Sequence, residues 1–385
     1  MELVFFVDHQ CNLRCTYCYT GEKATRTMSV DTMRAGVALA LRAPPPHLDV
    51  AFFGGEPLLR LELLRATIAH VEAEVAALGP RAPSLRFLLN TNATLVDDEV
   101  VALFAPPRVS TAFVSLDGPR HVHDRHRVNA AGRGSFDDVM VGLSRLRAGG
   151  VAFQLMVVVT PATAPDLGAT LRHALTLGAT KIQLNADHSA TWDAAALAGL
   201  RAGLEAAGEV WADAFRGGQA PRVEPLHTKI LGHVKGGVPC PSRCLLGGDE
   251  LTVTPSGRLY PCPQMVAEDR GGELVLGHVA TGVDPARQRA LQAQKDEALE
   301  ICGECDLQAR CQSHCGCRHV ASSGRLGRIT ETLCDLEGEW IAAADRVAEA
   351  MFAERVPAFL DFYYRKAWAP ATGARLIQLR RSSRS

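Results

Sequence analysis

Three cysteines near the N-terminus form the most informative motif of the chain. Cys11, Cys15 and Cys18 have the spacing C-x3-C-x2-C, and they follow a short apolar run that ends at Asp8. A structural zinc ion or a closed iron–sulfur cluster takes four protein ligands, whereas three thiolates on a [4Fe–4S] cluster leave one iron open to a small molecule. The spacing therefore predicts a cluster with one exchangeable position, on the loop that leaves the first strand. Buried or zinc-bound cysteines are the alternative.

A second group of cysteines lies far along the chain. No cysteine occurs between positions 18 and 240, and the nine others are Cys240, Cys244, Cys262, Cys302, Cys305, Cys311, Cys315, Cys317 and Cys334. In a reducing compartment such thiols serve as metal ligands or redox groups rather than as disulfides. The clustering therefore predicts two separate metal regions.

The overall composition is that of a globular protein with a sizeable core. The chain has 385 residues, of which 47% are hydrophobic and 22% charged, so two domains are expected. Its formal net charge of −1 offers no basic surplus to a nucleic acid or an anionic membrane. Neither a membrane-spanning run nor a signal peptide is apparent. We therefore expect a cytoplasmic protein with neither of these partners.

Short apolar runs alternate with longer amphipathic segments, which predicts an α/β fold. The predicted strands cover residues 3–7, 48–53, 85–89, 111–116, 153–159 and 181–184, and the predicted helices cover 30–41, 61–77, 136–148 and 166–177. This rhythm favours a parallel sheet shaped as a partial barrel, with ligands bound at the carboxyl ends of the strands. A break at Gly236, Gly237 and Pro239 predicts a barrel domain over 1–235. A cysteine-rich domain over 236–340 and a helical segment with a tail over 341–385 follow.

With Tyr19 directly after Cys18, the first cysteine motif resembles that of the radical S-adenosylmethionine (SAM) superfamily. This resemblance implies that Cys11, Cys15 and Cys18 hold a [4Fe–4S] cluster whose fourth iron chelates SAM. It also implies a partial (β/α)6 TIM-like barrel and an enzyme that generates a 5′-deoxyadenosyl radical to abstract hydrogen from its substrate. An electron donor such as flavodoxin or ferredoxin would reduce the cluster.

The resemblance extends to motifs that follow the predicted strands. Together they imply a set of SAM contacts: Tyr17, Gly54, Gly55, Glu56, Asn92, Ser115, Asp117 and Arg127. In the family's GGEP element, the glycines would let the backbone approach the methionine amino group, and Glu56 would complement its charge. Arg127 could bind the methionine carboxylate through two parallel hydrogen bonds. A plain strand-to-helix turn is the alternative for Glu56, and a surface ion pair is the alternative for Arg127.

Polar residues after two other strands are candidate substrate contacts. Asn90, Thr91 and Asn92 stand where the family commonly has a TNG stretch, with Ala93 in place of the glycine. After the sixth strand the candidates are Asn185, Asp187 and His188, and a solvated loop is the alternative for these three.

The second cysteine group resembles the SPASM domain of radical SAM enzymes. This resemblance implies two closed auxiliary [4Fe–4S] clusters, three clusters in all. The first auxiliary cluster would be held by Cys240, Cys244, Cys262 and Cys315, and the second by Cys302, Cys305, Cys311 and Cys334. Cys317 is left over, either as a substitute for Cys315 or as a free thiol. Zinc is the alternative for this region. A hairpin over 251–260 is expected to return Cys262 to Cys244.

Members with this domain mostly modify peptides, so the resemblance implies a radical SAM peptide maturase. It would act on a ribosomally made precursor peptide, giving a crosslink or another side-chain modification. An anaerobic sulfatase-maturing (formylglycine-generating) enzyme is the alternative, but such enzymes follow the Cys262 position with an aspartate, and this chain has Pro263. A non-enzymatic iron–sulfur electron carrier is an alternative of another class. Because ten residues precede Cys11, we expect leader binding to be intrinsic or supplied by a partner.

Overall fold

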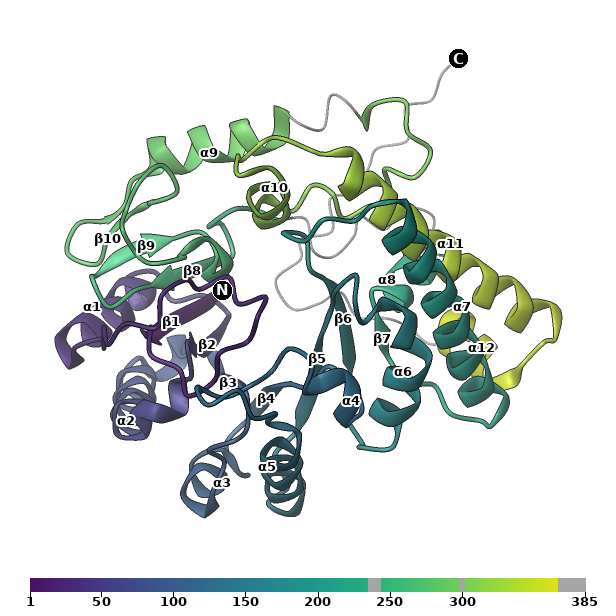
Figure 1. Cartoon of the computed structure of the whole chain (residues 1–385). Helices are drawn as coiled ribbons and strands as arrows, with labels where there is room; N and C mark the ends of the chain where they lie inside the picture. The colour runs from purple at the N-terminus through teal and green to yellow at the C-terminus, as the bar shows by residue number, and fades with distance from the viewer. Residues whose placement is uncertain (235–243, 298–301, 366–385) are drawn as a thin grey trace.

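One curved sheet is the framework of the protein. The structure is a computed structural model that describes residues 1–234, 244–297 and 302–365. Seven strands run parallel and side by side in chain order: β1 (Glu2–Asp8), β2 (His47–Gly54), β3 (Ser84–Thr91), β4 (Ser110–Ser115), β5 (Phe153–Val159), β6 (Ile182–Ala186) and β7 (Val223–Glu224). The sheet stays open (Figure 1). The six predicted strands and the partial barrel are therefore confirmed.

Helices cover the convex face of this sheet (Figure 1). They include α1 (Val30–Leu41), α2 (Leu61–Ala77), α3 (Asp98–Phe104), α5 (Phe136–Ala148) and α6 (Leu167–Leu175). The predicted ranges of α1, α2 and α5 are confirmed, and that of α6 is slightly too long. Ser29 caps α1 by accepting a hydrogen bond from Thr32 N at 3.0 Å. The sequence prediction omitted α3 because a seven-residue segment carries little helical periodicity.

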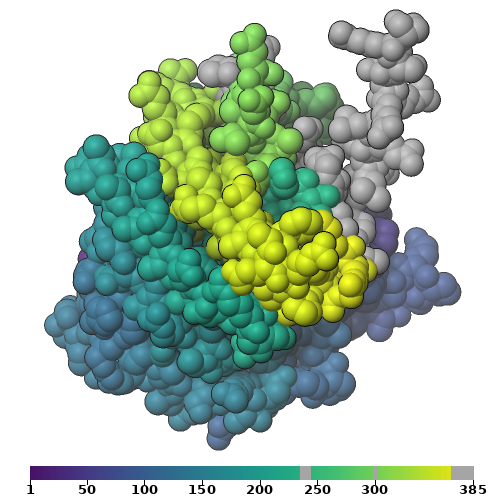
Figure 2. All heavy atoms as spheres, turned by 90° about the vertical axis from the view of Figure 1, so that its right-hand side faces the viewer, coloured from purple at the N-terminus to yellow at the C-terminus, as the bar shows by residue number. Residues whose placement is uncertain are grey.

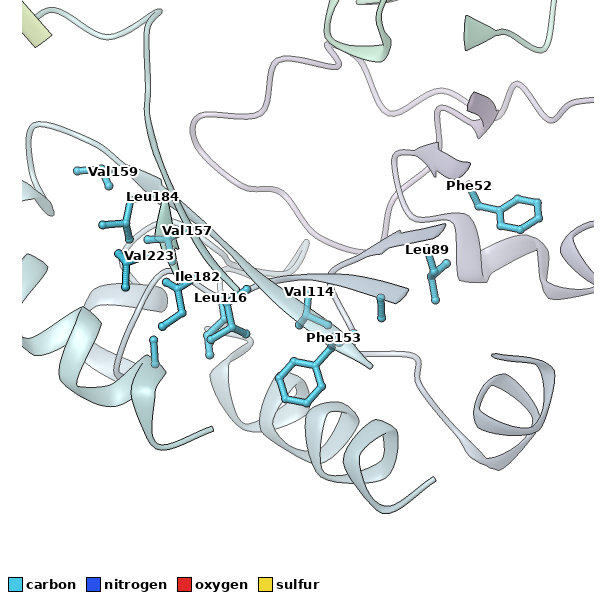
Figure 3. Close-up of a cluster of buried hydrophobic side chains, with 14 of the residues drawn as sticks. Phe52, Leu89, Val114, Leu116, Phe153, Val157, Val159, Ile182, Leu184 and Val223 are labelled. Atoms are coloured by element: carbon cyan, nitrogen blue, oxygen red, sulfur yellow. The ribbon is translucent and has the colours of Figure 1, made fainter. Parts of the chain in front are cut away.

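The strands bury one face against these helices. Along β5, Phe153, Val157 and their alternate neighbours are buried, while the residues between them are only half-buried. Figure 3 shows these side chains beside Phe52, Leu89 and Val114 from the neighbouring strands. The opposite face carries a much smaller apolar cluster. Because this face has little apolar packing of its own, the loops that follow the strands must hold the polar residues of the site in place.

The second cysteine region is joined directly to the barrel sheet. Strand β8 (Glu250–Val253) pairs in parallel with β1, and β9 (Arg258–Tyr260) returns antiparallel to β8. Gly257 supplies the turn with a φ of +81°, so the predicted hairpin is confirmed. The short strands β10 (Gly277–His278) and β11 (Gly282–Val283) extend the described sheet to eleven strands.

The remaining helices surround the cysteine region and one side of the barrel: α7 (Ala194–Arg216), α8 (Leu226–Val234), α9 (Pro285–Glu297), α10 (Gly316–Ser323), α11 (Glu331–Ala353) and α12 (Pro357–Leu360). Figure 2 shows the C-terminal helices, in yellow and yellow-green, lying across the teal α7. The domain boundary predicted at 340 falls inside α11, and the division into domains stays a prediction. No helix of the described ranges is long and apolar enough to cross a membrane.

Candidate active site

The loops that follow β1 and β2 pack tightly against each other at the carboxyl edge of the sheet. Gly55 N donates to Asp8 O at 2.8 Å, and Glu56 N donates to Gln10 O at 3.0 Å. A Cβ atom on Gly55 would lie 2.2 Å from Gln10 O, and Gly54 has a φ of +142°, so both positions require glycine. Without a Cβ atom, these two glycines lie directly against the backbone of Asp8 and Gln10, which precede the cysteine motif. Their place beside the methionine amino group remains a prediction.

Asp8 binds residues at both ends of the loop that carries Cys11, Cys15 and Cys18. It was not among the site residues predicted from the sequence. Its buried carboxylate accepts hydrogen bonds from Gln10 N at 2.9 Å, Thr27 Oγ1 at 2.6 Å, Arg26 N at 3.2 Å and Arg60 Nε at 2.7 Å. Burial raises the pKa of Asp8, but these hydrogen bonds outweigh it and bring the pKa below its usual value. The carboxylate thus anchors the cysteine loop to the residues that follow it.

The three N-terminal thiols share one loop, and each interacts electrostatically with its neighbour in the motif. Cys18 Sγ accepts a hydrogen bond from Lys23 Nζ at 2.8 Å and lies 3.3 Å from Thr20 Oγ1. Burial raises the pKa of the Cys11 thiol to about 12. Burial also raises the pKa of Cys18, but the hydrogen bonds from Lys23 and Thr20 outweigh it, so the net shift is downward. A cation beside a thiol favours the thiolate, which is the form that binds metals.

Glu56 joins the loop after β2 to the loop after β3. Its side chain is buried, and its carboxylate accepts hydrogen bonds from Leu58 N at 3.1 Å, Thr91 Oγ1 at 2.8 Å and Asn92 N at 2.8 Å. Burial outweighs these bonds and raises the pKa of Glu56 to about 7. Asn92 Nδ2 in turn donates to Asn12 Oδ1, in the cysteine loop, at 2.9 Å. Glu56 therefore caps a turn, as the plain-turn alternative requires, and also positions Asn92.

Arg127 forms a buried ion pair with Asp117. Arg127 is 6% exposed, and its Nε and Nη2 donate to Asp117 Oδ2 and Oδ1 at 2.9 and 3.1 Å. Tyr17 OH and Val158 N also donate to this carboxylate. The alternative of a surface ion pair is therefore wrong. The two parallel bonds predicted for the methionine carboxylate are made with Asp117 in this structure, and Ser115 ends β4 two residues before it. The SAM contacts of these residues remain predictions.

His126 is a further residue that the sequence reasoning missed. Its Nδ1 lies 2.7 Å from Thr16 Oγ1 in the cysteine loop, and its Nε2 lies 3.0 Å from Thr160 Oγ1 at the end of β5. Burial is the main cause that lowers the pKa of His126. The available signal was its position within the stretch from His123 to Arg127, which the family resemblance already singled out.

The predicted substrate residues after β6 lie at the same edge of the sheet. Asp187 Oδ1 accepts hydrogen bonds from Ser189 N at 3.0 Å and Ser189 Oγ at 2.6 Å, which is a local turn. Burial, reinforced by the charge of Arg318, lowers the pKa of His188 to about 3. Asn185 is half-buried at the end of its strand. The turn agrees with the solvated-loop alternative for Asp187, and the substrate contacts remain predictions.

The described cysteines of the second region fall into two groups. In the first, Cys244 contacts Cys315, and Cys262 contacts Cys317. In the second, Cys334 interacts electrostatically with its three predicted companions Cys302, Cys305 and Cys311. Cys240 lies outside the described residues. The grouping follows the prediction, with Cys317 added to the first group.

Comparison with known proteins identifies a domain in the first half of the chain. Residues 7–174 match the radical SAM superfamily, and this range includes the three cysteines of the first motif and Arg127. Residues 7–174 therefore form a radical SAM domain. This domain and the relatives described below indicate an enzyme, and a radical SAM domain implies SAM and a [4Fe–4S] cluster as cofactors.

The chain also matches individual proteins over most of its length. It is 28% identical over 337 residues to the serine-type anaerobic sulfatase-maturating enzyme of Klebsiella aerogenes, covering 82% of this chain and 80% of the relative. The solved structure of native anSMEcpe with bound AdoMet has a TM-score of 0.76 at 18% identity, covering 91% of this chain and 98% of that one. Streptococcus suis SuiB bound to precursor peptide SuiA has a TM-score of 0.57 at 13% identity, covering 86% and 75%. The structural likenesses show the fold.

The donor set of the first motif fits the cluster that the superfamily uses. Three partly buried thiols share one loop, and Cys11 Sγ accepts a hydrogen bond from Leu13 N at 3.4 Å, while Cys18 Sγ accepts one from Lys23. Such donors are typical partners of cluster thiolates. Within residues 1–234, 244–297 and 302–365, no group of three His, Cys, Asp or Glu side chains is arranged around a single-ion position.

Proposed function

We propose that this radical SAM enzyme oxidises a side chain of a peptide or protein substrate in the manner of the sulfatase-maturating enzymes, converting serine or cysteine to formylglycine. The match to the Klebsiella aerogenes enzyme supports this proposal, because it covers 82% of the chain and 80% of the relative. Such coverage must include much of the second cysteine region as well as the barrel. The crosslinking peptide maturase expected from the sequence becomes the second candidate.

In this proposal Cys11, Cys15 and Cys18 hold the SAM-binding cluster. When bound, this cluster and SAM supply a 5′-deoxyadenosyl radical that abstracts hydrogen from the substrate. The protein's own part is positional: Asp117 fixes Arg127 and Tyr17 where the cysteine loop meets β4 and β5. A site held by buried hydrogen bonds keeps its geometry between turnovers.

The second cysteine region would hold two auxiliary clusters. Their thiols lie in the two groups described above, and the β8–β9 hairpin joins the first group to β1 of the barrel. When bound by these thiols, auxiliary clusters would supply electron transfer between the substrate site and an external protein such as a flavodoxin or ferredoxin, which would also reduce the SAM-binding cluster. The protein would thus have the composition of a three-cluster enzyme with a peptide substrate.

Pro263 favours the second candidate. It follows Cys262 and begins a 3-10 turn of residues Pro263–Met265. A proline side chain cannot accept a proton, so the aspartate that sulfatase-maturing members carry at this place has no counterpart at position 263. A peptide maturase that makes a carbon–carbon or carbon–oxygen bond would not need that aspartate in the same position.

The experiment uses the reconstituted enzyme with SAM and dithionite under anaerobic conditions. The substrates are a sulfatase peptide with serine at the target position, the same peptide with cysteine, and the same peptide with alanine as the matched control. An aldehyde on the serine or cysteine peptide, seen by mass spectrometry and hydrazide capture, supports the proposal. Turnover of SAM without aldehyde, together with a crosslink in a peptide encoded beside the gene, would support the second candidate.

A further inference from the structure

Four thiols of the second region converge where the β8–β9 hairpin meets helix α10. Cys315 Sγ and Cys317 Sγ lie 3.2 Å apart. Cys244 contacts Cys315, and Cys262 contacts Cys317, so the sulfurs form a continuous group. The four come from three separate stretches of chain, and only the fold brings them together.

The surroundings of this group suit thiolates. Cys244 Sγ accepts hydrogen bonds from Gly316 N and Leu246 N, and Cys262 Sγ accepts one from Gln264 N. Backbone N–H groups directed at sulfur stabilise the negative charge of cluster ligands. Because Cys315 is the N-cap of α10, the positive end of the helix dipole also lies at this group. Such donors would serve little purpose beside protonated, unligated thiols.

A partly buried cation completes the site. Arg318 follows Cys317 directly and interacts electrostatically with both Cys315 and Cys317. Its guanidinium is held in place because Nη1 donates to Glu337 Oε1 at 2.5 Å and Nη2 donates to Gln312 Oε1 at 3.0 Å. A fixed positive charge beside sulfur offsets part of the negative charge that four thiolates bring to one cluster.

We propose that Cys244, Cys262, Cys315 and Cys317 are the four ligands of the auxiliary [4Fe–4S] cluster beside the barrel. The family resemblance assigns the fourth position to Cys240 and treats Cys317 as left over. In the assignment made here both cysteines of the C-x-C pair are ligands, and Cys240 is not required. Each thiol releases its proton to solvent as its sulfur binds iron, so the four thiolates are formed on assembly.

Alanine variants test this assignment without any substrate. Cys317→Ala, Cys315→Ala and Cys240→Ala are reconstituted anaerobically, and iron and sulfide are counted per chain together with Mössbauer spectra. We expect the first two variants to lose one cluster, about one third of the iron of a three-cluster enzyme, and Cys240→Ala to keep all of it. Loss of a cluster in Cys240→Ala, or a full iron count in Cys317→Ala, overturns the assignment. Retention of the SAM-binding cluster signal shows that each variant is folded.

A second measurement needs no variant. Iodoacetamide is applied to the anaerobic wild-type holoenzyme, and again after iron removal by a chelator, and the labelled cysteines are mapped by mass spectrometry. We expect Cys317 to be protected until iron is removed. Labelling of Cys317 in the holoenzyme contradicts the proposal. These outcomes do not depend on which peptide the enzyme oxidises, so the failure of the proposed function would leave them unchanged.

Discussion

Asp117 and Arg127 are joined by two buried hydrogen bonds at the point where the cysteine loop meets strands β4 and β5. Arg127 Nε and Nη2 donate to the two carboxylate oxygens of Asp117, and Tyr17 OH donates to the same group. One carboxylate thus connects a loop residue next to Cys18, the segment after β4 and, through Val158 N, strand β5. The pair fixes the relative positions of these segments, because separating the two side chains would leave a buried charge without its partner.

Replacing Asp117 by asparagine should therefore destabilise the fold. The variant leaves the Arg127 guanidinium buried without its counter-charge, and the expected loss is about 3–5 kcal/mol in the free energy of unfolding. Urea denaturation of the protein without clusters measures it. Asp137→Asn is the matched control, because Asp137 pairs with Arg120 at the exposed surface. If Asp117→Asn lowers the free energy of unfolding no more than the control does, the buried ion pair does not stabilise the fold.

Gly142 and Gly338 both lie in helices, but substitution by alanine should have opposite effects on stability at the two positions. A Cβ atom on Gly142 of α5 would lie 2.0 Å from Ala93 O, in the loop that also carries Asn92. Gly142→Ala should cost about 1–3 kcal/mol or more, because backbone must move to admit the methyl group. Gly338→Ala in α11 should instead stabilise the fold by about 1 kcal/mol, since an added Cβ atom would meet nothing within 4 Å beyond the adjacent backbone of its own helix. Equal thermal shifts in the same direction would contradict this packing.

His123 should make stability depend on pH. Burial, with a contribution from the charge of Arg127, lowers its pKa from 6.5 to about 3. His123 Nδ1 accepts a hydrogen bond from Asp117 N at 3.3 Å, and Nε2 lies 3.0 Å from Ser135 Oγ. Because the unfolded chain binds a proton that the folded chain excludes, stability falls as the pH drops below 6.5 toward the folded pKa.

The measurement compares wild type with His123→Gln by urea denaturation at several pH values. The stability advantage of wild type at neutral pH should shrink by about 1.4 kcal/mol per pH unit below the unfolded pKa. His121→Gln serves as the control because the His121 imidazole is exposed. An advantage that stays constant with pH would mean that His123 binds its proton in the folded protein as readily as in the unfolded chain, and would contradict the prediction.

Lys23 should tune the SAM-binding cluster. Its Nζ lies 2.8 Å from Cys18 Sγ, so the ammonium group favours additional negative charge on the cluster that Cys18 would hold. Lys23→Met should shift the midpoint potential of that cluster to a more negative value, as measured by a redox titration followed by EPR. Lys181→Met is the control, because Lys181 precedes β6 at the opposite end of the barrel. An unchanged or more positive potential in Lys23→Met would contradict the predicted effect.

The sequence predicts features that depend on local periodicity and spacing. Alternating burial in β5 and the helical period of α2 can be read directly, because each depends on neighbours within one element. The two residues of β7 and the seven of α3 are too short to give such a signal. Partners distant in sequence are a different matter. The order of residues in the sequence does not show that Asp8 binds Arg60, or that the guanidinium of Arg127 donates to Asp117.

The cysteines show the same division. The C-x3-C-x2-C spacing predicts a shared loop for Cys11, Cys15 and Cys18 because their separation is short. The grouping of Cys317 with Cys262 depends on the β8–β9 hairpin and on where α10 begins, which the spacing alone could not resolve. The sequence therefore left the role of Cys317 open, and the structure places it within a thiol group.

The central claim is that Cys11, Cys15 and Cys18 hold a cluster with one iron available to SAM. Its most direct test is the yield of 5′-deoxyadenosine when the reconstituted enzyme is incubated anaerobically with SAM and dithionite, in wild type and in Cys15→Ala. We predict that wild type forms 5′-deoxyadenosine and that Cys15→Ala, with its auxiliary clusters intact, forms none. Equal yields from the two proteins, or no product from fully loaded wild type, would contradict the claim.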